Sequence, residues 1–139
     1  MNPRPRSACA VALALVSLFS FRTNAGQYIY FSPTPAWVAE AMLKLARVDS
    51  HDVVYDLGSG DGRIVLLAAE KYGARGVGIE LMPSLIDVSR KAAVERHVED
   101  KVTFIQGDFY ETDISDATVV TLYLSPSVNR MLEPKLRAA

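Results

Sequence analysis

Strand-type and helix-type segments alternate along most of this chain of 139 residues. Runs rich in β-branched and other apolar residues predict strands at residues 53–57, 75–80, 101–106 and 117–124. Apolar residues at helical spacing predict helices between them at 63–72 and 83–97. This alternation favours a parallel sheet with helices on both faces. Right-handed crossovers then place strand 53–57 between its neighbours, so the predicted class is α/β with a doubly wound parallel sheet.

Two further helices are predicted outside this alternating core. One runs from Pro35 to Val48, with Thr34 as its N-cap and Pro35 at the first helical position, where a missing N–H costs nothing. Its apolar face consists of Val38, Met42 and Leu45. The corresponding face of helix 83–97 consists of Leu85, Val88 and Ala92. A short helical piece follows Pro126.

The first 25 residues have the layout of a secretory signal peptide. Arg4 and Arg6 form a basic start, residues 8–19 are an apolar run, and small residues precede Gly26. The run is short for a membrane span, which needs about 20 residues. We therefore expect export to the periplasm, with a retained membrane anchor or a misassigned start codon as alternatives. The predicted division is 1–25 as signal or anchor, 26–50 as N-terminal loop and helix, and 51–139 as the main domain.

Charge and cysteine content exclude several functions. Without residues 1–25, the chain has 12 basic and 16 acidic residues and no basic cluster. Because neutralisation of phosphates dominates affinity for nucleic acids, no nucleic-acid partner is expected. Cys9 is the only cysteine, so a disulfide within the chain and a cysteine-based metal site are excluded, and no metal site is predicted.

A glycine-rich turn follows the first core strand, in the sequence Asp-Leu-Gly-Ser-Gly-Asp-Gly at residues 56–62. Its glycines allow a tight turn and a close approach of backbone N–H groups to a ligand. No lysine follows, which excludes a phosphate loop, and the glycine spacing counts against NAD or FAD. Asp56 and Asp61 beside the glycines favour a ligand with an ammonium or sulfonium group and no phosphate. Arg63 is either a substrate-side cation or a residue on the helix surface.

Two more acids follow strand ends. Glu80 lies at the end of strand 75–80, about 20 residues after the turn, where an acid accepts the hydroxyls of a ribose. A solvated acid at a strand end is its alternative. Asp108 follows strand 101–106 and is placed to take an adenine amino group while Phe109 packs on the ring, with simple turn chemistry as the alternative.

Together these segments resemble the class I S-adenosylmethionine-dependent methyltransferases. The matching pieces are residues 54–62, 78–80, 107–109 and 119–126. With Ser-Pro-Thr-Pro at 32–35, the chain looks like a bacterial branch similar to the mitochondrial lysine methyltransferases that modify a membrane-embedded ATP synthase subunit. It resembles the non-SET histone lysine methyltransferases more distantly. The resemblance implies a Rossmann-like fold and S-adenosylmethionine as cofactor.

The resemblance also implies roles for individual residues. Those expected to bind the cofactor are Asp56, Gly58, Ser59, Gly60, Asp61, Glu80, Leu81, Asp108 and Phe109. Those expected to border the acceptor are Tyr30, Pro33, Thr121, Tyr123 and Pro126. No residue is assigned as a catalytic base, because transfer from a sulfonium needs positioning more than acid catalysis. A lysine acceptor must arrive deprotonated, which desolvation or a nearby carboxylate arranges.

One departure from the family concerns the sheet. The family has seven strands in the order 3-2-1-4-5-7-6, and only the first four are predicted here. Strand 117–124 would then be an exposed apolar edge, and such edges recruit other chains. The chain therefore reads as a C-terminally truncated methyltransferase, with a half-domain that dimerises through this edge as the alternative.

The leading functional hypothesis is a methyltransferase that acts on protein lysine. A non-catalytic nucleoside-binding remnant of such an enzyme is the second hypothesis, and an NAD-dependent oxidoreductase is the third. A retained anchor would hold the enzyme close to a membrane substrate.

Overall fold

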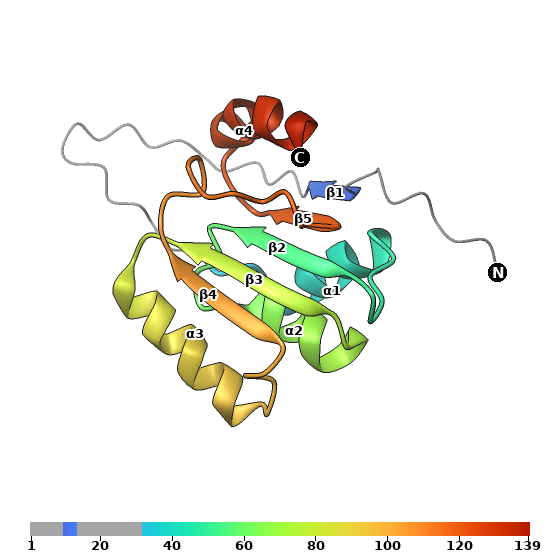
Figure 1. Cartoon of the computed structure of the whole chain (residues 1–139), viewed down its shortest axis with the longest axis vertical. Coiled ribbons are helices and arrows are strands. Elements are labelled where there is room, and N and C mark those ends of the chain that lie inside the picture. The colour runs from blue at the N-terminus through green and yellow to red at the C-terminus, as the bar shows by residue number, and fades with distance from the viewer. Residues whose placement is uncertain (1–9, 14–31) are drawn as a thin grey trace.

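A five-stranded parallel sheet forms the centre of the protein. The structure is a computed structural model that describes residues 10–13 and 32–139. The strands are β1 (Ala10–Leu13), β2 (Val53–Leu57), β3 (Arg75–Glu80), β4 (Val102–Gln106) and β5 (Val119–Leu122). They lie in the order β1-β5-β2-β3-β4, and every neighbouring pair is parallel (Figure 1). β2 therefore lies between β5 and β3, as predicted.

Helices cover both faces of the sheet. They are α1 (Ala36–Leu45), α2 (Arg63–Tyr72), α3 (Pro83–Glu95) and α4 (Pro126–Ala138). α1, α2 and α3 pack on one face, where two apolar clusters join them to Val54, Val119 and Phe104. α4 and residues 109–117 pack on the other face, over Tyr55, Leu57, Ile79 and Val120. The α/β, Rossmann-like class is confirmed, with a core layer on each side of the sheet.

The element boundaries agree closely with the sequence predictions. β2, α2 and β3 have the predicted bounds, and β4, β5, α1 and α3 are shorter than predicted at one or both ends. α4 spans 13 residues, which makes it longer than the short piece predicted. Pro35, not Thr34, is the N-cap of α1, and no side chain caps this helix.

Two predicted helix faces were wrong by about one residue. α1 buries Ala39, Met42 and Leu43, whereas Leu45 at its last position is 77% exposed. α3 buries Ile86, Ser89 and Ala93, whereas Val88 is 50% exposed. The error in α3 has a clear cause: a serine was counted as outward-facing, although its hydroxyl has a buried partner, described below.

The sheet also contains a strand that the sequence did not predict. β1 lies within the apolar run assigned to the signal peptide, and it pairs with β5 in the register Ala10↔Val119 to Leu13↔Leu122. The expectation that β5 is an unpaired edge is therefore wrong for this structure, and with it the expectation that only four strands are present. The rest of the predicted signal, at residues 1–9 and 14–25, lies outside the described residues.

The carboxyl ends of β2 to β5 meet at one edge of the sheet, because all four strands are parallel. The glycine-rich turn, Glu80, Asp108 and Tyr123 follow these ends directly. In open α/β sheets, ligands bind at this edge. In residues 10–13 and 32–139, the structure contains no helix of the length and apolarity that a membrane span requires.

Candidate cofactor-binding site

The glycine-rich turn is fixed by backbone hydrogen bonds to the neighbouring strand. The N–H groups of Gly58 and Ser59 both donate to the carbonyl oxygen of Ile79 on β3, at 2.9 Å. Gly58, Gly60 and Gly62 have φ values of +79°, +56° and +78°, a region that side chains other than that of glycine rarely enter. The turn therefore has one defined shape, which the residue types in the sequence already require.

Glu80 holds the same turn from the end of β3. Its Oε2 accepts from the Gly60 N–H at 2.9 Å, and its Oε1 accepts from the Met82 N–H at 3.0 Å. The carboxylate thus lies against the turn, which is the position that the predicted ribose contact needs. The side chain of the next residue, Leu81, is 46% exposed beside it.

An apolar wall faces Gly58. A Cβ added at Gly58 would lie 2.9 Å from Leu124 Cδ2 and 3.7 Å from Phe109 Cε1, so these side chains approach the turn from β5 and β4. The Phe109 ring also packs on that of Tyr110, with 4.8 Å between ring centroids. Asp108 is exposed, and its Oδ1 accepts from the Tyr110 N–H at 2.8 Å. A carboxylate and an aromatic ring therefore stand where the sequence predicted contacts with adenine.

Asp56 lies beneath the turn, out of contact with solvent. Its side chain is buried, and its Oδ1 accepts from the Thr121 hydroxyl at 2.7 Å. Burial raises the pKa of this carboxyl to about 7, against the opposing effect of the Thr121 hydrogen bond and with smaller contributions from the charges of Glu80 and Asp61. Near neutral pH, Asp56 is therefore an acid that is only partly ionised.

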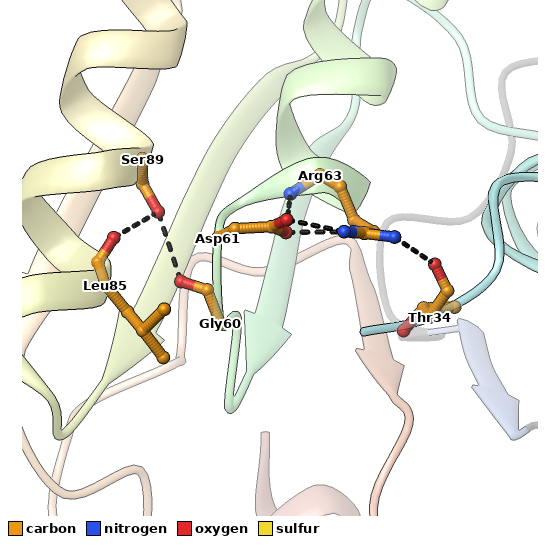
Figure 2. A network of polar contacts seen from close by, with 6 residues as sticks. All are labelled: Thr34, Gly60, Asp61, Arg63, Leu85 and Ser89. Atoms are coloured by element: carbon orange, nitrogen blue, oxygen red, sulfur yellow. Dashed lines mark hydrogen bonds and ion pairs between the residues drawn. The ribbon is translucent and has the colours of Figure 1, made fainter. Parts of the chain in front are cut away.

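Asp61 is paired with a cation. Arg63 Nε lies 2.9 Å from Asp61 Oδ1, and Arg63 Nη2 lies 2.5 Å from Asp61 Oδ2 (Figure 2). Burial alone would raise the pKa of the Asp61 carboxyl, but the hydrogen bonds and charge of Arg63 outweigh it and lower that pKa. Arg63 Nη1 also donates to the Thr34 carbonyl oxygen at 2.8 Å. Arg63 is therefore neither a free substrate-side cation nor an ordinary helix-surface residue.

These contacts change the electrostatic argument made from the sequence. Two free carboxylates were expected at the turn, yet Asp56 is partly protonated and the charge of Asp61 is balanced by Arg63. The negative charge that remains against the turn is that of Glu80. A preference for a cationic ligand therefore depends mainly on this one side chain.

The residues predicted to border the acceptor lie in different places. Tyr30 lies outside the described residues, and Pro33 is exposed just before the buried Thr34. Thr121 is fully buried, with its hydroxyl on Asp56, so it supports the turn from below. Tyr123 and Pro126 follow β5, and the hydroxyl of Ser125 accepts from the Val128 N–H as the N-cap of α4.

Sequence reasoning missed two residues that shape the site. Ser89 is fully buried in α3, and its Oγ donates to the carbonyl oxygens of Gly60 at 3.1 Å and Leu85 at 2.9 Å (Figure 2). Leu124 closes the apolar wall over Gly58. A serine on the core-facing side of an amphipathic helix was the available signal for the first. The second carried no signal beyond its position after a strand.

The side chains present fit S-adenosylmethionine. Gly58 leaves room for a ligand against the Leu124 and Phe109 wall, and Glu80 and Asp108 offer carboxylates at the ends of neighbouring strands. Among the described residues there is no group of three or more histidine, cysteine or acidic side chains arranged to hold a metal ion. The roles of the individual residues in ligand binding stay predictions.

Comparison with known proteins identifies relatives of one kind. Residues 56–139 match the ANTKMT methyltransferase domain. The chain is 41% identical, over 78% of its length, to a protein-lysine N-methyltransferase of Saccharolobus islandicus. It is 36% identical, over 76% of its length, to a human lysine N-methyltransferase named for one of the subunits of ATP synthase.

A solved structure is similar both in sequence and in fold. It is a protein of Salinibacter ruber described as an RNA methyltransferase, in complex with S-adenosyl-L-homocysteine. The two share 62% identity over 76% of this chain, with a TM-score of 0.75. The chain spans 69% of that protein, 68% of the archaeal enzyme and 45% of the human one.

Proposed function

The chain belongs to the ANTKMT methyltransferase domain family, and on that premise we propose that it methylates a lysine side chain of a protein. The observation that carries this proposal is the 41% identity with an archaeal protein-lysine N-methyltransferase. The chain is a relative of S-adenosylmethionine-dependent methyltransferases, and its cofactor is S-adenosylmethionine. The choice of acceptor, and catalysis by a chain of this length, belong to the proposal.

The cofactor supplies a methyl group on a sulfonium, which an acceptor displaces in line while the sulfur leaves uncharged. The chain's own residues bind and orient. The Glu80 carboxylate holds the turn and is placed for ribose hydroxyls, and Phe109 and Leu124 exclude water from the side of the adenine. Because the step needs little proton transfer beyond a deprotonated lysine, alignment of cofactor and acceptor provides most of the rate gain.

Replacement of Glu80 tests the cofactor site. The Glu80→Gln protein loses a charge that accepts two backbone N–H groups, and hydrogen bonds to a charged group contribute about 1.5–3 kcal/mol. We expect affinity for S-adenosylhomocysteine, measured by isothermal titration calorimetry, to fall about 10- to 100-fold. Glu99→Gln, which changes an exposed acid, provides the matched control. Equal affinity of parent and Glu80→Gln proteins would contradict the assignment of this site.

An RNA acceptor is the second candidate, because the Salinibacter protein that shares 62% identity is described as an RNA methyltransferase. Radiolabelled S-adenosylmethionine distinguishes the two acceptors in a cell extract. Label that protease removes and ribonuclease spares, recovered as methyl-lysine after acid hydrolysis, supports a protein acceptor. Label that only ribonuclease removes contradicts the lysine proposal and favours RNA.

We also propose that residues 1–25 direct the protein to the periplasm or anchor it at a membrane. The basic start and the apolar run 8–19 support this proposal. Mass spectrometry of the mature N-terminus tests it: a chain that starts at Gly26 shows cleavage, and a soluble chain that retains Met1 or Asn2 contradicts both export and anchoring. Cleavage would remove β1 and expose β5, the condition under which dimerisation through β5 is proposed; gel filtration of the cleaved form measures it.

A further inference from the structure

Arg63 connects two segments that are far apart in the sequence. It is the first residue of α2, and its guanidinium contacts both carboxylate oxygens of Asp61 in the glycine-rich turn. Its remaining nitrogen, Nη1, donates to the carbonyl oxygen of Thr34, 29 residues earlier. Figure 2 shows Arg63 between these two partners, with Asp61 on one side and Thr34 on the other.

This bridge is partly shielded from water. The side chains of Arg63 and Asp61 are 33% and 26% exposed, and Thr34 is 7% exposed. A planar guanidinium is suited to this arrangement, because its fork of donors binds a carboxylate in two places while another N–H remains for a carbonyl. Lysine carries the same charge but cannot make this set of contacts.

The position of Asp61 depends on the conformation of the turn. Asp61 stands between Gly60 and Gly62, whose φ values are both positive, so a shift in the turn would redirect its carboxylate. The backbone N–H of Gly60 is held by Glu80, the residue placed for the ribose. Thus a ligand that contacts Glu80 and the turn acts on the same short piece of backbone that orients Asp61 and, through it, Arg63.

The other end of the bridge lies on the side where the acceptor is expected. Thr34 immediately precedes Pro35, the N-cap of α1, and the Pro35 carbonyl oxygen accepts from the N–H groups of Val38 and Ala39. The first turn of α1 therefore depends on where residues 32–35 are held. The indole of Trp37, in the same turn of α1, is 74% exposed.

We propose that Arg63 is a positioning residue that transmits cofactor binding in the turn to residues 32–35 and the first turn of α1, and so fixes one wall of the acceptor site. This inference rests on the proposed function, since it takes S-adenosylhomocysteine as a ligand of the turn. Arg63 acts through Asp61 and Thr34 rather than by contact with the methyl group. By reciprocity, a fixed wall also strengthens cofactor binding.

Hydrogen exchange with S-adenosylhomocysteine tests the inference on the full chain. In the parent protein, ligand should slow amide exchange both in the turn and in residues 36–39. In Arg63→Met, ligand should protect the turn alone, and affinity should fall about 3- to 10-fold. Trp37 is the only tryptophan, so its fluorescence provides a second measure: it should respond to ligand in the parent and not in Arg63→Met.

Two variants distinguish the bridge from charge or folding. Arg63→Lys keeps the positive charge beside Asp61 without the full set of contacts, so it should bind ligand within about 3-fold of the parent yet leave residues 36–39 unprotected. Asp61→Asn removes the ion pair from the other side and should behave as Arg63→Met does, should that variant fail to fold. Arg96→Met, which removes a surface ion pair with Glu70, is the matched control and should behave as the parent does.

The outcomes separate this inference from the proposed function. A parent protein that does not bind S-adenosylhomocysteine contradicts the proposed function. A parent that binds it without protection of residues 36–39, or bridge variants that retain this protection in full, overturns the role of Arg63 and leaves the cofactor site intact.

Discussion

Two regions at the carboxyl edge of the sheet are held in different ways. The first, here called the turn region, consists of residues 56–62 with their contacts on β3 and α3. The second, here called the α4 region, consists of residues 108–113 and α4. The turn region is held mainly by hydrogen bonds from Ile79, Glu80 and Ser89 to its backbone.

The α4 region is held mainly by apolar contacts. Leu132 and Leu136 of α4 pack against the cluster around Tyr55 and Val120, and Lys135 Nζ donates to the carbonyl oxygens of Tyr110 and Thr112. Asn129 is buried, and neither its amide nitrogen nor its amide oxygen has a hydrogen-bond partner in the part of the chain that the structure describes.

This contrast has a physical meaning. A cofactor of fixed shape requires fixed donors and acceptors, and a network of short hydrogen bonds provides them before the ligand arrives. Apolar contacts are less directional, so a helix held by them tolerates small shifts. We therefore expect changes in the turn region to affect both stability and cofactor binding, and changes in the α4 region to affect stability alone.

The largest expected effect is that of Gly62→Ala. A Cβ at this position would lie 2.6 Å from Phe104 Cε1 and 2.9 Å from Ser89 Oγ, at a φ of +78°. Left-handed backbone costs about 1–2 kcal/mol and overpacking of a core about 1–3 kcal/mol. We expect a loss of about 3 kcal/mol in the free energy of unfolding, measured by urea denaturation, with a loss of affinity for S-adenosylhomocysteine.

Gly73→Ala is the matched control for this prediction. Gly73 ends the same helix at a φ of +70°, but the nearest atom to a Cβ there, Ser50 Cβ, lies 3.4 Å away. The expected loss is about 1 kcal/mol, from the backbone conformation alone, with unchanged affinity. Equal losses at the two glycines would show that packing against Phe104 and Ser89 does not restrain the turn.

The next effect concerns pH and Asp56. Because the pKa of the buried carboxyl is about 7 and that of an ordinary aspartate is 3.8, the folded protein binds more protons than the unfolded chain between these values. The free energy of unfolding therefore falls as pH rises from about 4 to about 7, by at most roughly 1 kcal/mol per pH unit. Asp56→Asn removes this dependence while it keeps an acceptor for the Thr121 hydroxyl.

Parent and Asp56→Asn proteins should thus have similar stability at pH 5, and the variant should be more stable, by roughly 2 kcal/mol, at pH 8. Thermal or urea denaturation across this range, without ligand, measures the difference. The groups that face Asp56, namely Thr121, Glu80 and Asp61, are common to both proteins, so their titration largely cancels. Parallel curves would mean that Asp56 is ionised in the folded protein at pH 5.

The turn region could be predicted from sequence because its signals are local. The buried run Val53–Leu57, the glycines after it and the period of α2 each specify a structure within a few residues, and the predicted bounds of β2 and α2 were confirmed. The spacing of about 20 residues from the turn to Glu80 follows from one strand–helix–strand unit. Local rules were sufficient there.

Contacts between distant segments could not be predicted in this way. The link from Arg63 to Thr34 spans 29 residues and ends on a backbone carbonyl, which has no sequence signature. The pair of Arg63 with Asp61 is two residues apart, outside the spacings at which helical side chains meet. The strand β1 was assigned to an export signal, because an apolar run does not reveal which partner it will find.

The smallest expected effect tests the α4 region. Lys135→Met keeps most of the side chain's apolar length but removes the ammonium that binds the carbonyl oxygens of Tyr110 and Thr112, at 3.0 Å and 2.6 Å. We expect a loss of about 1 kcal/mol in the free energy of unfolding, below the range for hydrogen bonds to a charged group because these carbonyls regain water. Arg130→Met, on an exposed position of the same helix, should lose almost nothing.

Affinity for S-adenosylhomocysteine makes this variant informative about the comparison. If the two regions are independent, Lys135→Met binds the ligand within about twofold of the parent, since sites without shared partners act additively. A tenfold loss would show that α4 and residues 108–113 help to hold Phe109 against Gly58. The cofactor site would then extend across both regions, and the hydrogen-bonded turn would account for only part of it.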